Sequence, residues 1–380
     1  MKKMLVFFTM LCLSLASYGP ASSIYGSSQP GQIPVSGGVP QAAASLPMPT
    51  APVPITATAA PVQPAVQTPT VTQPQPATNA QNPQAATATP IATLPPVPSG
   101  KIGIPNFDHI VLIMLENKPF SVLNGSQMPL LEGLANQNVL LSNYYAIAHP
   151  SLPNYIALMS GSTQGITSDC TTCFLNQPNL ADEIEASGRT WKAYLEDMPS
   201  PCFIGDSGKY AQKHNPFIYF DSIRLNAARC DRSILPLTSL DSDLANKQLP
   251  NFSFIMPNLC NSGHDCSAAV ADNWVNTMVT KLQASPALGI NSLIIVAFDE
   301  GSDKDPSSCC GLPSPAGGHV AVMLISPTAL PDMTDNSTYS HYSLLKTILT
   351  AWNLPDLGAS AQAQPILAPW TGQVSPAPTP

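Results

Sequence analysis

The stretch Ile110-Val-Leu-Ile-Met-Leu-Glu-Asn117 and its distant counterpart Leu293-Ile-Ile-Val-Ala-Phe-Asp-Glu300 decide the fold of this 380-residue chain. In each, an uninterrupted apolar run stops abruptly on side chains that carry oxygen atoms. Such a run is typical of a strand that is buried on both faces of a parallel sheet. The carboxyl ends of parallel strands meet at one edge of the sheet, where α/β proteins bind their ligands. The sequence therefore predicts that four side chains converge at this edge: Glu116, Asn117, Asp299 and Glu300.

Strand-like and helix-like segments alternate along most of the remaining domain. Further strands are expected at 139–146, 190–195, 252–256 and 320–326, and helices at 127–138, 155–160, 180–187, 269–284 and 342–352. This alternation predicts a parallel sheet with helices on both faces. The expected fold class is α/β, in the form of a three-layer α/β/α sandwich with a mostly parallel central sheet.

Composition divides the chain into four parts. Residues 1–20 contain a basic pair, an apolar stretch and then small residues, which is the order of a cleaved signal peptide. Residues 21–100 are rich in Pro, Ala, Thr and Gln and carry no charged side chain, which predicts a disordered linker. A catalytic domain is expected at 101–372 and a disordered tail at 373–380. We therefore expect a secreted protein (periplasmic, extracellular or held at the cell surface) with no transmembrane segment in the mature chain.

Charge and cysteine content narrow the classes of function. The net charge is −8 and no basic cluster stands out, so no nucleic-acid partner is expected. The chain has nine cysteines, and all but Cys12 lie beyond the signal peptide. In an exported protein such cysteines are normally paired as disulfides, although the sequence does not select one pairing.

Ser151 follows a proline-pinned turn, His149-Pro-Ser-Leu-Pro-Asn154, and precedes a helical segment. Taken alone, this turn favours a helix-capping serine. A strand–turn–helix geometry would also raise the hydroxyl to the same sheet edge, and a serine hydroxyl becomes a good nucleophile when a base or a metal lowers its pKa. Gathered carboxylates repel each other unless a cation or a proton lies between them. We therefore expect one divalent metal ion, of unspecified identity, held by these groups: Glu116, Asn117, Ser151, Asp299 and Glu300.

The histidines are placed by their context. His264 and His319 each lie beside a strand end, which favours a functional role for both. For His149, His214 and His341 the sequence leaves a structural and a functional role equally open.

Five short motifs stand in a characteristic order along the domain. They are Glu116-Asn117, His149-Pro-Ser-Leu-Pro-Asn-Tyr155, Pro257-Asn-Leu-Cys-Asn-Ser-Gly-His-Asp265, Phe298-Asp-Glu-Gly301 and Gly318-His-Val320. On these motifs the chain resembles the phosphoesterase family that groups bacterial and fungal acid phosphatases with bacterial phospholipases C, within the alkaline phosphatase superfamily. The resemblance runs from about Asp108 to Trp352. The turn at Ser151 is also similar to the Thr-x-Pro-Asn turn of nucleotide pyrophosphatases, in which the hydroxyl residue is the nucleophile.

The resemblance implies a role for each of the site residues. The five groups around Ser151 match the family's metal-and-nucleophile cluster, and His264 and His319 would be catalytic, binding phosphate oxygens or protonating the leaving group. Substrate contacts are expected from a further set: Asn117, Asn154, His149, His214 and His341. A second metal would lie near His264, Asp265 and His319. Asn258 counts against that second ion, since two-metal enzymes of the superfamily have an aspartate there.

The predicted function is that of an exported, metal-dependent acid phosphatase that hydrolyses small phosphomonoesters through a phosphoserine intermediate. If His264 or His319 must be protonated to bind phosphate, activity should favour acidic pH, since an unperturbed histidine titrates near ~6.5. The alternative is a phospholipase C, which would apply the same chemistry to a phospholipid diester. A non-enzymatic binding module on a Pro-rich stalk ranks third, because it gives no reason for four oxygen-bearing side chains to share a sheet edge.

Overall fold

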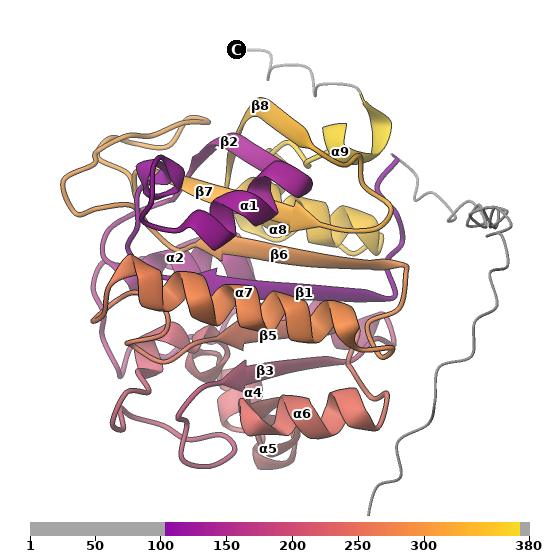
Figure 1. Ribbon diagram of the computed structural model, residues 1–380. Coiled ribbons are helices and arrows are strands. Elements are labelled where there is room, and N and C mark those ends of the chain that lie inside the picture. Colours follow the sequence, from indigo (N-terminus) through magenta and orange to yellow (C-terminus); the bar gives the residue numbers. More distant parts are fainter. Residues whose placement is uncertain (1–102, 373–380) are drawn as a thin grey trace, which may run out of the picture. The chain divides into compact units, whose positions relative to one another are not determined.

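An eight-stranded mixed sheet lies at the centre of the domain in the computed structural model, which describes residues 103–372 (Figure 1). Its strands are β1 His109–Leu115, β2 Val139–Tyr145, β3 Trp191–Leu195, β4 Ile234–Pro236, β5 Phe252–Met256, β6 Ser292–Phe298, β7 His319–Ile325 and β8 Met333–Ser340. They lie in the order β4-β3-β5-β1-β6-β7-β2-β8. Neighbouring strands are parallel except in the two pairs that contain β7. The predicted signal peptide, linker and tail fall outside the described residues.

Helices cover both faces of this sheet. They are α1 Pro129–Gln137, α2 Ser151–Ser160, α3 Leu180–Ala186, α4 Asp221–Arg224, α5 Ala227–Ser233, α6 Thr238–Ala245, α7 Ala268–Ala284, α8 His341–Ala351 and α9 Ala368–Thr371, with short 3-10 segments η1 Phe120–Leu123, η2 Gln212–His214, η3 Pro216–Tyr219 and η4 Gly358–Ala361. In Figure 1, α1, α6 and α7 lie in front of the sheet and α2 and α8 lie behind it. The predicted α/β/α class with a mostly parallel sheet is therefore confirmed.

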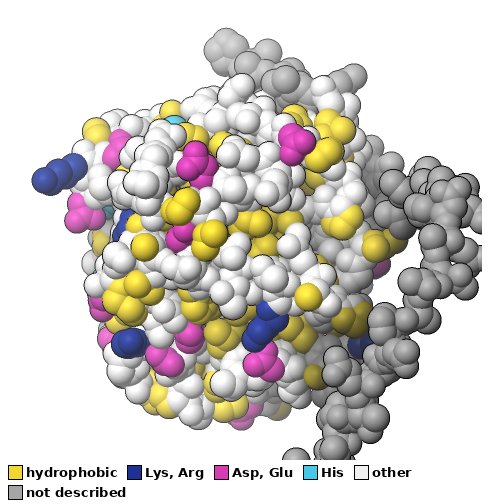
Figure 2. Space-filling model, in the orientation of Figure 1, with side chains coloured by type: hydrophobic (Ala, Val, Ile, Leu, Met, Phe, Trp, Pro, Cys, Tyr) yellow, Lys and Arg dark blue, Asp and Glu magenta, His cyan; other side chains and the backbone are white. Residues whose placement is uncertain are grey.

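The described residues also bear on two predicted absences, a membrane-spanning helix and a basic surface patch. None of the helices in the described range combines the length and the apolar character that a membrane crossing needs. On the face drawn in Figure 2, basic side chains are few and separated from one another, with acidic and apolar side chains between them. That face offers no basic patch of the kind that binds nucleic acid.

The register of the two central strands places the site. All of β6, and all of β1 except His109, is buried, as the uninterrupted apolar runs predict. In the β1–β6 ladder Leu115 pairs with Phe298, and the amide of Asp299 donates to the carbonyl of Leu115. Glu116 and Asp299 therefore leave the sheet side by side.

β7 brings a histidine to this same edge by running in the opposite direction. In the ladder with β2, its first residue, His319, pairs with Tyr145, the last residue of β2. The beginning of an antiparallel strand thus lies where the parallel strands end.

Neither of the two outermost strands was predicted from the sequence. β4 has only three residues, and β8 reads Met-Thr-Asp-Asn-Ser-Thr-Tyr-Ser, with an exposed or half-exposed side chain at most positions. Strands at the edge of a sheet are not covered on both sides, so they carry no apolar run. The apolar pattern therefore predicts the inner strands and leaves the outer ones without a signal.

Gly161 ends α2 at a close crossing of two backbones. Its φ of 72° lies in the left-handed region, and a Cβ added there would lie 1.8 Å from the carbonyl oxygen of Leu357. The carbonyl of Gly161 in turn accepts from the amide of Ala359 at 2.7 Å. The helix that begins at Ser151 is therefore fixed at its far end by a contact that only glycine permits.

Replacing Gly161 with alanine should lower the free energy of unfolding by about 2–4 kcal/mol, because strain at positive φ is added to a collision with backbone atoms. Gly165→Ala is the matched control, since Gly165 also has a positive φ (76°) but has no atom within 4 Å of the added Cβ. The control should lose about 1 kcal/mol. Urea unfolding of both variants measures the difference, and equal losses would contradict the packing argument.

Candidate active site

Ser151 is the first residue of α2 and is buried at the carboxyl edge of the sheet. Its Oγ lies 3.0 Å from Oε1 of Glu300 and 3.3 Å from Oε2 of Glu116. Two carboxylates that follow different strands thus meet at one hydroxyl group. The roles of these residues as nucleophile and metal ligands stay predictions.

Asn154 holds the turn that presents Ser151. Its Oδ1 accepts from the amides of Ile147 and Ala148, at 2.8 and 3.0 Å, and its Nδ2 donates to the carbonyl of Ala148 at 2.7 Å. The amide of Leu152, next to the serine, donates to Oδ1 of Asp169 at 3.0 Å. The side chain of Asn154 is thus occupied by the turn's own backbone, and the substrate contact expected of it stays a prediction.

Asn117 and Asp299 carry buried oxygen atoms without partners. The amide of Asn117, which has a φ of 52°, donates to Oδ1 of Asp299 at 3.0 Å. The other oxygen of each side chain, Oδ1 of Asn117 and Oδ2 of Asp299, is buried and has no hydrogen-bond partner within residues 103–372. Buried acceptors left in this state are costly, and a cation would satisfy both. The residues present therefore fit a divalent metal ion.

The pKa values of the buried carboxyl groups also favour a bound cation. Burial, followed by the charge of Asp299, raises the pKa of Glu116 well above its usual range and raises the pKa of Glu300 to about 9. Burial also raises the pKa of Asp299, against the hydrogen bond from Asn117, which lowers it. Three carboxyl groups in this position do not all ionise near neutral pH unless a positive charge joins them.

Two groups of potential metal-ligand atoms adjoin Ser151. One is formed by Glu116, His214 and His264, and the other by His149, Glu300 and Asp303. In each group the three ligand atoms lie within 4.8 Å of one another. Each group contains one of the two carboxylates that contact the serine hydroxyl.

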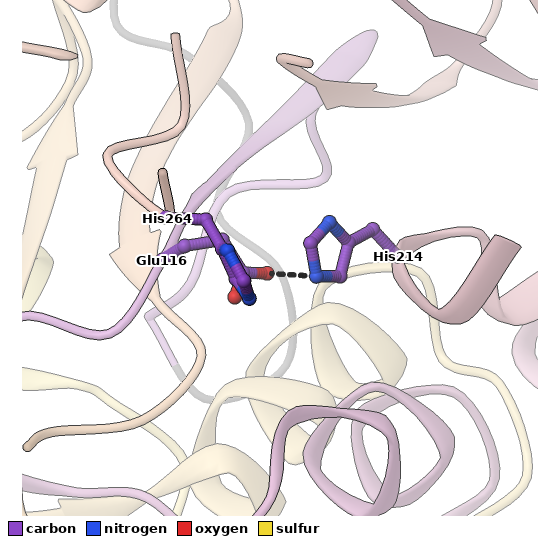
Figure 3. Close-up of side chains that lie close together, drawn as sticks. All are labelled: Glu116, His214 and His264. Carbon is purple, nitrogen blue, oxygen red and sulfur yellow. Dashed lines mark ion pairs between the residues drawn. The ribbon is translucent and has the colours of Figure 1, made fainter. Parts of the chain in front are cut away.

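The first group is drawn in Figure 3, where His214 reaches Glu116 from η2. Nε2 of His214 lies 3.2 Å from Oε1 of Glu116, and the hydroxyl of Tyr155 donates to that same oxygen. Burial, reinforced by the charge of Lys213, lowers the pKa of His214 well below its usual value. His214 is therefore a neutral imidazole, the form that binds a metal or accepts a hydrogen bond.

In the second group His149 connects Glu300 to the loop that follows β6. Its Nδ1 contacts Oε2 of Glu300, and its Nε2 lies 3.3 Å from the carbonyl oxygen of Asp305. Asp305 also accepts from the amide of His319 at 2.9 Å. This loop passes close to the serine turn at Gly317, where an added Cβ would lie 2.7 Å from the carbonyl oxygen of Ala148.

His319 and His341 lie at the same edge with different neighbours. His319 stacks on Phe120, and its Nε2 lies 2.9 Å from the carbonyl oxygen of Ser142. His341 is fully buried, and its Nε2 lies 2.6 Å from the carbonyl oxygen of Asp299. Burial lowers the pKa of His341 to about 4. In these positions His341 supports the strand end at Asp299, and the roles expected of both histidines stay predictions.

The set of ligands expected for a second ion differs from the set that the structure brings together. His264 groups with Glu116 and His214, and no group of potential ligands among the described residues contains Asp265 or His319. Nδ1 of His264 lies 2.6 Å from Oδ1 of Asp265, which makes Asp265 a partner of the histidine.

Asn258 shapes the loop that carries His264. Its Oδ1 accepts from the amides of Cys260 and Asn261, at 3.0 and 2.8 Å, and its Nδ2 donates to Asp197 at 2.8 Å. An aspartate here would face Asp197 without the amide donor. The loop is also closed by a disulfide.

The expected disulfides are present, and three of the four connect cysteines no more than six positions apart. They are Cys170–Cys173, Cys202–Cys230, Cys260–Cys266 and Cys309–Cys310. The third closes the loop that carries His264, and Lys118 holds this loop with a hydrogen bond from Nζ to the carbonyl of Gly263, at 2.6 Å. The disulfides thus stabilise loops around the site.

Three residues near the two ligand groups have no site role predicted from the sequence: Asp169, Lys213 and Asp303. Asp303 follows Asp299 and Glu300 closely in the chain, so its acidic character after a strand end was an available signal. Lys213 immediately precedes His214. Asp169 lies in a loop without strand or helix periodicity, and nothing in the sequence connects it to Ser151.

Comparisons with known proteins identify the family of the chain. The family model described as the Phosphoesterase family matches residues 119–355, more than half of the chain, and the chain belongs to this family. It is 34% identical, over 71% of its length, to a phosphate-repressible acid phosphatase from Penicillium chrysogenum, of which the match covers 65%, just under two thirds. It is 32% identical to a phosphatidylinositol-3-phosphatase from Mycobacterium tuberculosis, over 74% of this chain and 88% of that protein.

A solved structure is also similar. A protein in the alkaline phosphatase superfamily from Vibrio parahaemolyticus superposes with a TM-score of 0.49 and 11% identity, over 71% of this chain and 73% of that chain. A likeness at this level carries no argument about function.

Without metal, the protein should become less stable as pH rises from about 7 to about 9. Folded Glu300 keeps its proton up to about pH 9, whereas an unfolded glutamate loses it near ~4.3, so the folded state binds more protons across this range. His214 and His341 add nothing to this slope, because their lowered pKa values leave them neutral in the folded state and an unfolded histidine is neutral above ~6.5. Melting temperatures measured in a chelator should therefore fall across the interval.

Adding a divalent ion should reduce this fall, because the cation takes over the role of the bound protons. Glu300→Gln is the control, and its chelated form should show a shallower slope because one titrating carboxyl is gone. A melting temperature that is flat or rises over this interval would contradict the raised pKa values.

Proposed function

We propose that the protein is an exported, metal-dependent acid phosphatase that hydrolyses phosphomonoesters through a phosphoserine intermediate. The observation that carries the proposal is the position of the Ser151 hydroxyl, within hydrogen-bond distance of both Glu116 and Glu300. The orphaned oxygens of Asn117 and Asp299 lie at the same strand ends. A hydroxyl among buried acceptors is a poor nucleophile unless something positive lowers its pKa.

One divalent ion would be held by the groups that the sequence predicted: Glu116, Asn117, Ser151, Asp299 and Glu300. When bound, it would lower the pKa of the serine hydroxyl and offset the charge of the phosphate. The oxygen ligands suit Mg, Ca or Mn, and the imidazoles of His214 or His149 would admit Zn or Fe.

The reaction then proceeds in two displacements at Ser151. Its Oγ attacks phosphorus in line and forms the phosphoserine, while the ester oxygen leaves and takes up a proton. Water then attacks the phosphoserine, releases inorganic phosphate and gives one of its own protons to Oγ. Two inversions give net retention of configuration at phosphorus.

Relatives support a monoester as the substrate. Both curated relatives described above are phosphatases by name, and one name specifies the 3-phosphate of phosphatidylinositol, a monoester carried on a lipid head group. We therefore propose a phosphomonoester, small or lipid-borne, in preference to the diester that a phospholipase C cleaves. Four disulfides support a location in an oxidising compartment.

Ser151→Ala should abolish hydrolysis of p-nitrophenyl phosphate, with a loss of at least about 10⁴-fold in kcat, because no covalent intermediate can form. Ser200→Ala, at an exposed loop position, is the control and should keep wild-type activity. Melting temperatures of both variants test that the fold is retained. Substantial activity in a folded Ser151→Ala protein would remove this residue as the nucleophile.

Wild-type protein should hydrolyse p-nitrophenyl phosphate at least about 10²-fold faster, in kcat/KM, than p-nitrophenyl phosphocholine, if the site is built for monoesters. Both activities should be lost on chelation and return with one added divalent ion. A preference for the phosphocholine diester would instead favour the phospholipase C reading.

A further inference from the structure

Lys213 places an ammonium group beside the first ligand group. Its Nζ lies 2.8 Å from Oδ2 of Asp169 and 3.2 Å from Nε2 of His264, and its side chain is 20% exposed. Asp169 uses its other oxygen to accept from the amide of Leu152, the residue after Ser151. A single carboxylate therefore connects the ammonium to the beginning of the helix that carries the serine.

The hydrogen bonds of His264 direct a lone pair to this ammonium. Nδ1 lies 2.6 Å from an oxygen of Asp265, and an ionised carboxylate can only accept, so Nδ1 carries the hydrogen. Nε2 is then the acceptor that faces Lys213. Because Nδ1 is engaged by Asp265, Nε2 is also the nitrogen that remains for an ion held by Glu116, His214 and His264.

A divalent ion and the ammonium compete for the same place. An ion bound at Nε2 of His264 would face a positive charge 3.2 Å from its own ligand atom. Asp169 and His264 together offer Lys213 a carboxylate and an imidazole, which are the ligand types of a metal site. The lysine lies where a second cation would find its ligands.

We propose that the ammonium of Lys213 takes the place of a second metal ion and binds a non-bridging oxygen of the phosphomonoester dianion. Two of the three N–H bonds of the ammonium are directed to Asp169 and His264, which leaves the third for the substrate. This inference rests on the proposed function and extends it to the charge of the substrate. Asp169 is a positioning residue, since it fixes the lysine relative to α2.

The consequence is selectivity for doubly charged substrates. A monoester dianion carries one more negative charge than a diester. A fixed cation therefore binds the monoester more strongly. A single divalent ion held beside Ser151 would serve both kinds of substrate, because both share the attacked phosphorus. Lys213 should therefore matter far more for monoesters than for diesters.

The first test compares p-nitrophenyl phosphate with bis(p-nitrophenyl) phosphate in wild-type protein and in Lys213→Met. We expect kcat/KM for the monoester to fall about 10²–10³-fold, as on removing one charge-stabilising donor, and kcat/KM for the diester to fall less than about 10-fold. Lys209→Met, at an exposed position of the same segment, should change neither value. Lys213→Gln, which keeps N–H donors for Asp169 and His264, replaces the methionine variant if that variant does not fold. Equal losses on both substrates would overturn the proposal.

The second test counts bound metal and does not depend on activity. Lys213→Ala removes the competing charge, so it should bind one more divalent ion per chain than wild type at saturation, measured by elemental analysis after dialysis. The additional ion should be lost again in the double variant Lys213→Ala with His264→Ala. Equal counts in wild type and Lys213→Ala would overturn the proposal. A wild-type protein that hydrolyses no phosphate ester would overturn the proposed function instead, and the metal count would still decide the role of Lys213.

Discussion

Three carboxylates buried around one hydroxyl group form the constraint on which the rest of the site depends. Glu116, Asp299 and Glu300 are almost fully buried, and burial raises the pKa of each. A fold gains nothing in stability from such a cluster, because desolvated like charges destabilise it until protons or a cation join them. Its presence at a sheet edge therefore reflects binding chemistry, and the neighbouring contacts of Tyr155 and His214 with Glu116 serve to hold it in place.

The architecture concentrates these groups by strand register. β1 and β6 are adjacent and end together, so two acidic sequences separated by more than 180 positions become neighbours without any long side-chain reach. The serine arrives from a different strand, β2, through a turn whose geometry is fixed by Asn154. α2 is then held at its other end by the Gly161 crossing. The groups of the candidate site are thus positioned by backbone pairing or by a fully satisfied turn.

This division explains what the sequence could predict. A buried strand appears in the sequence as an apolar run. These runs, and the oxygen-bearing residues that end them, predicted the inner strands, the fold class and the cluster at Glu116 and Asp299. The partners of His319, His341 and Lys213 could not be found in this way. His319 and His341 begin β7 and α8 and contact backbone carbonyls that are distant in the sequence, and Lys213 contacts two loop residues, Asp169 and His264. Such long-range contacts have no periodic signal.

The distribution of charge around the serine follows from these two sources. The sheet contributes negative side chains, which come from strand ends and converge by register. The connections between strands contribute His149 and His264 from irregular loops, and Lys213 from the short 3-10 segment η2. If the substrate is the proposed phosphate ester, the strand-end carboxyl groups attract it only through the proposed metal ion, and any further positive charge must come from the connections between strands. Substrate selectivity would then be decided by residues such as Lys213, while the strand ends would hold the proposed metal and nucleophile.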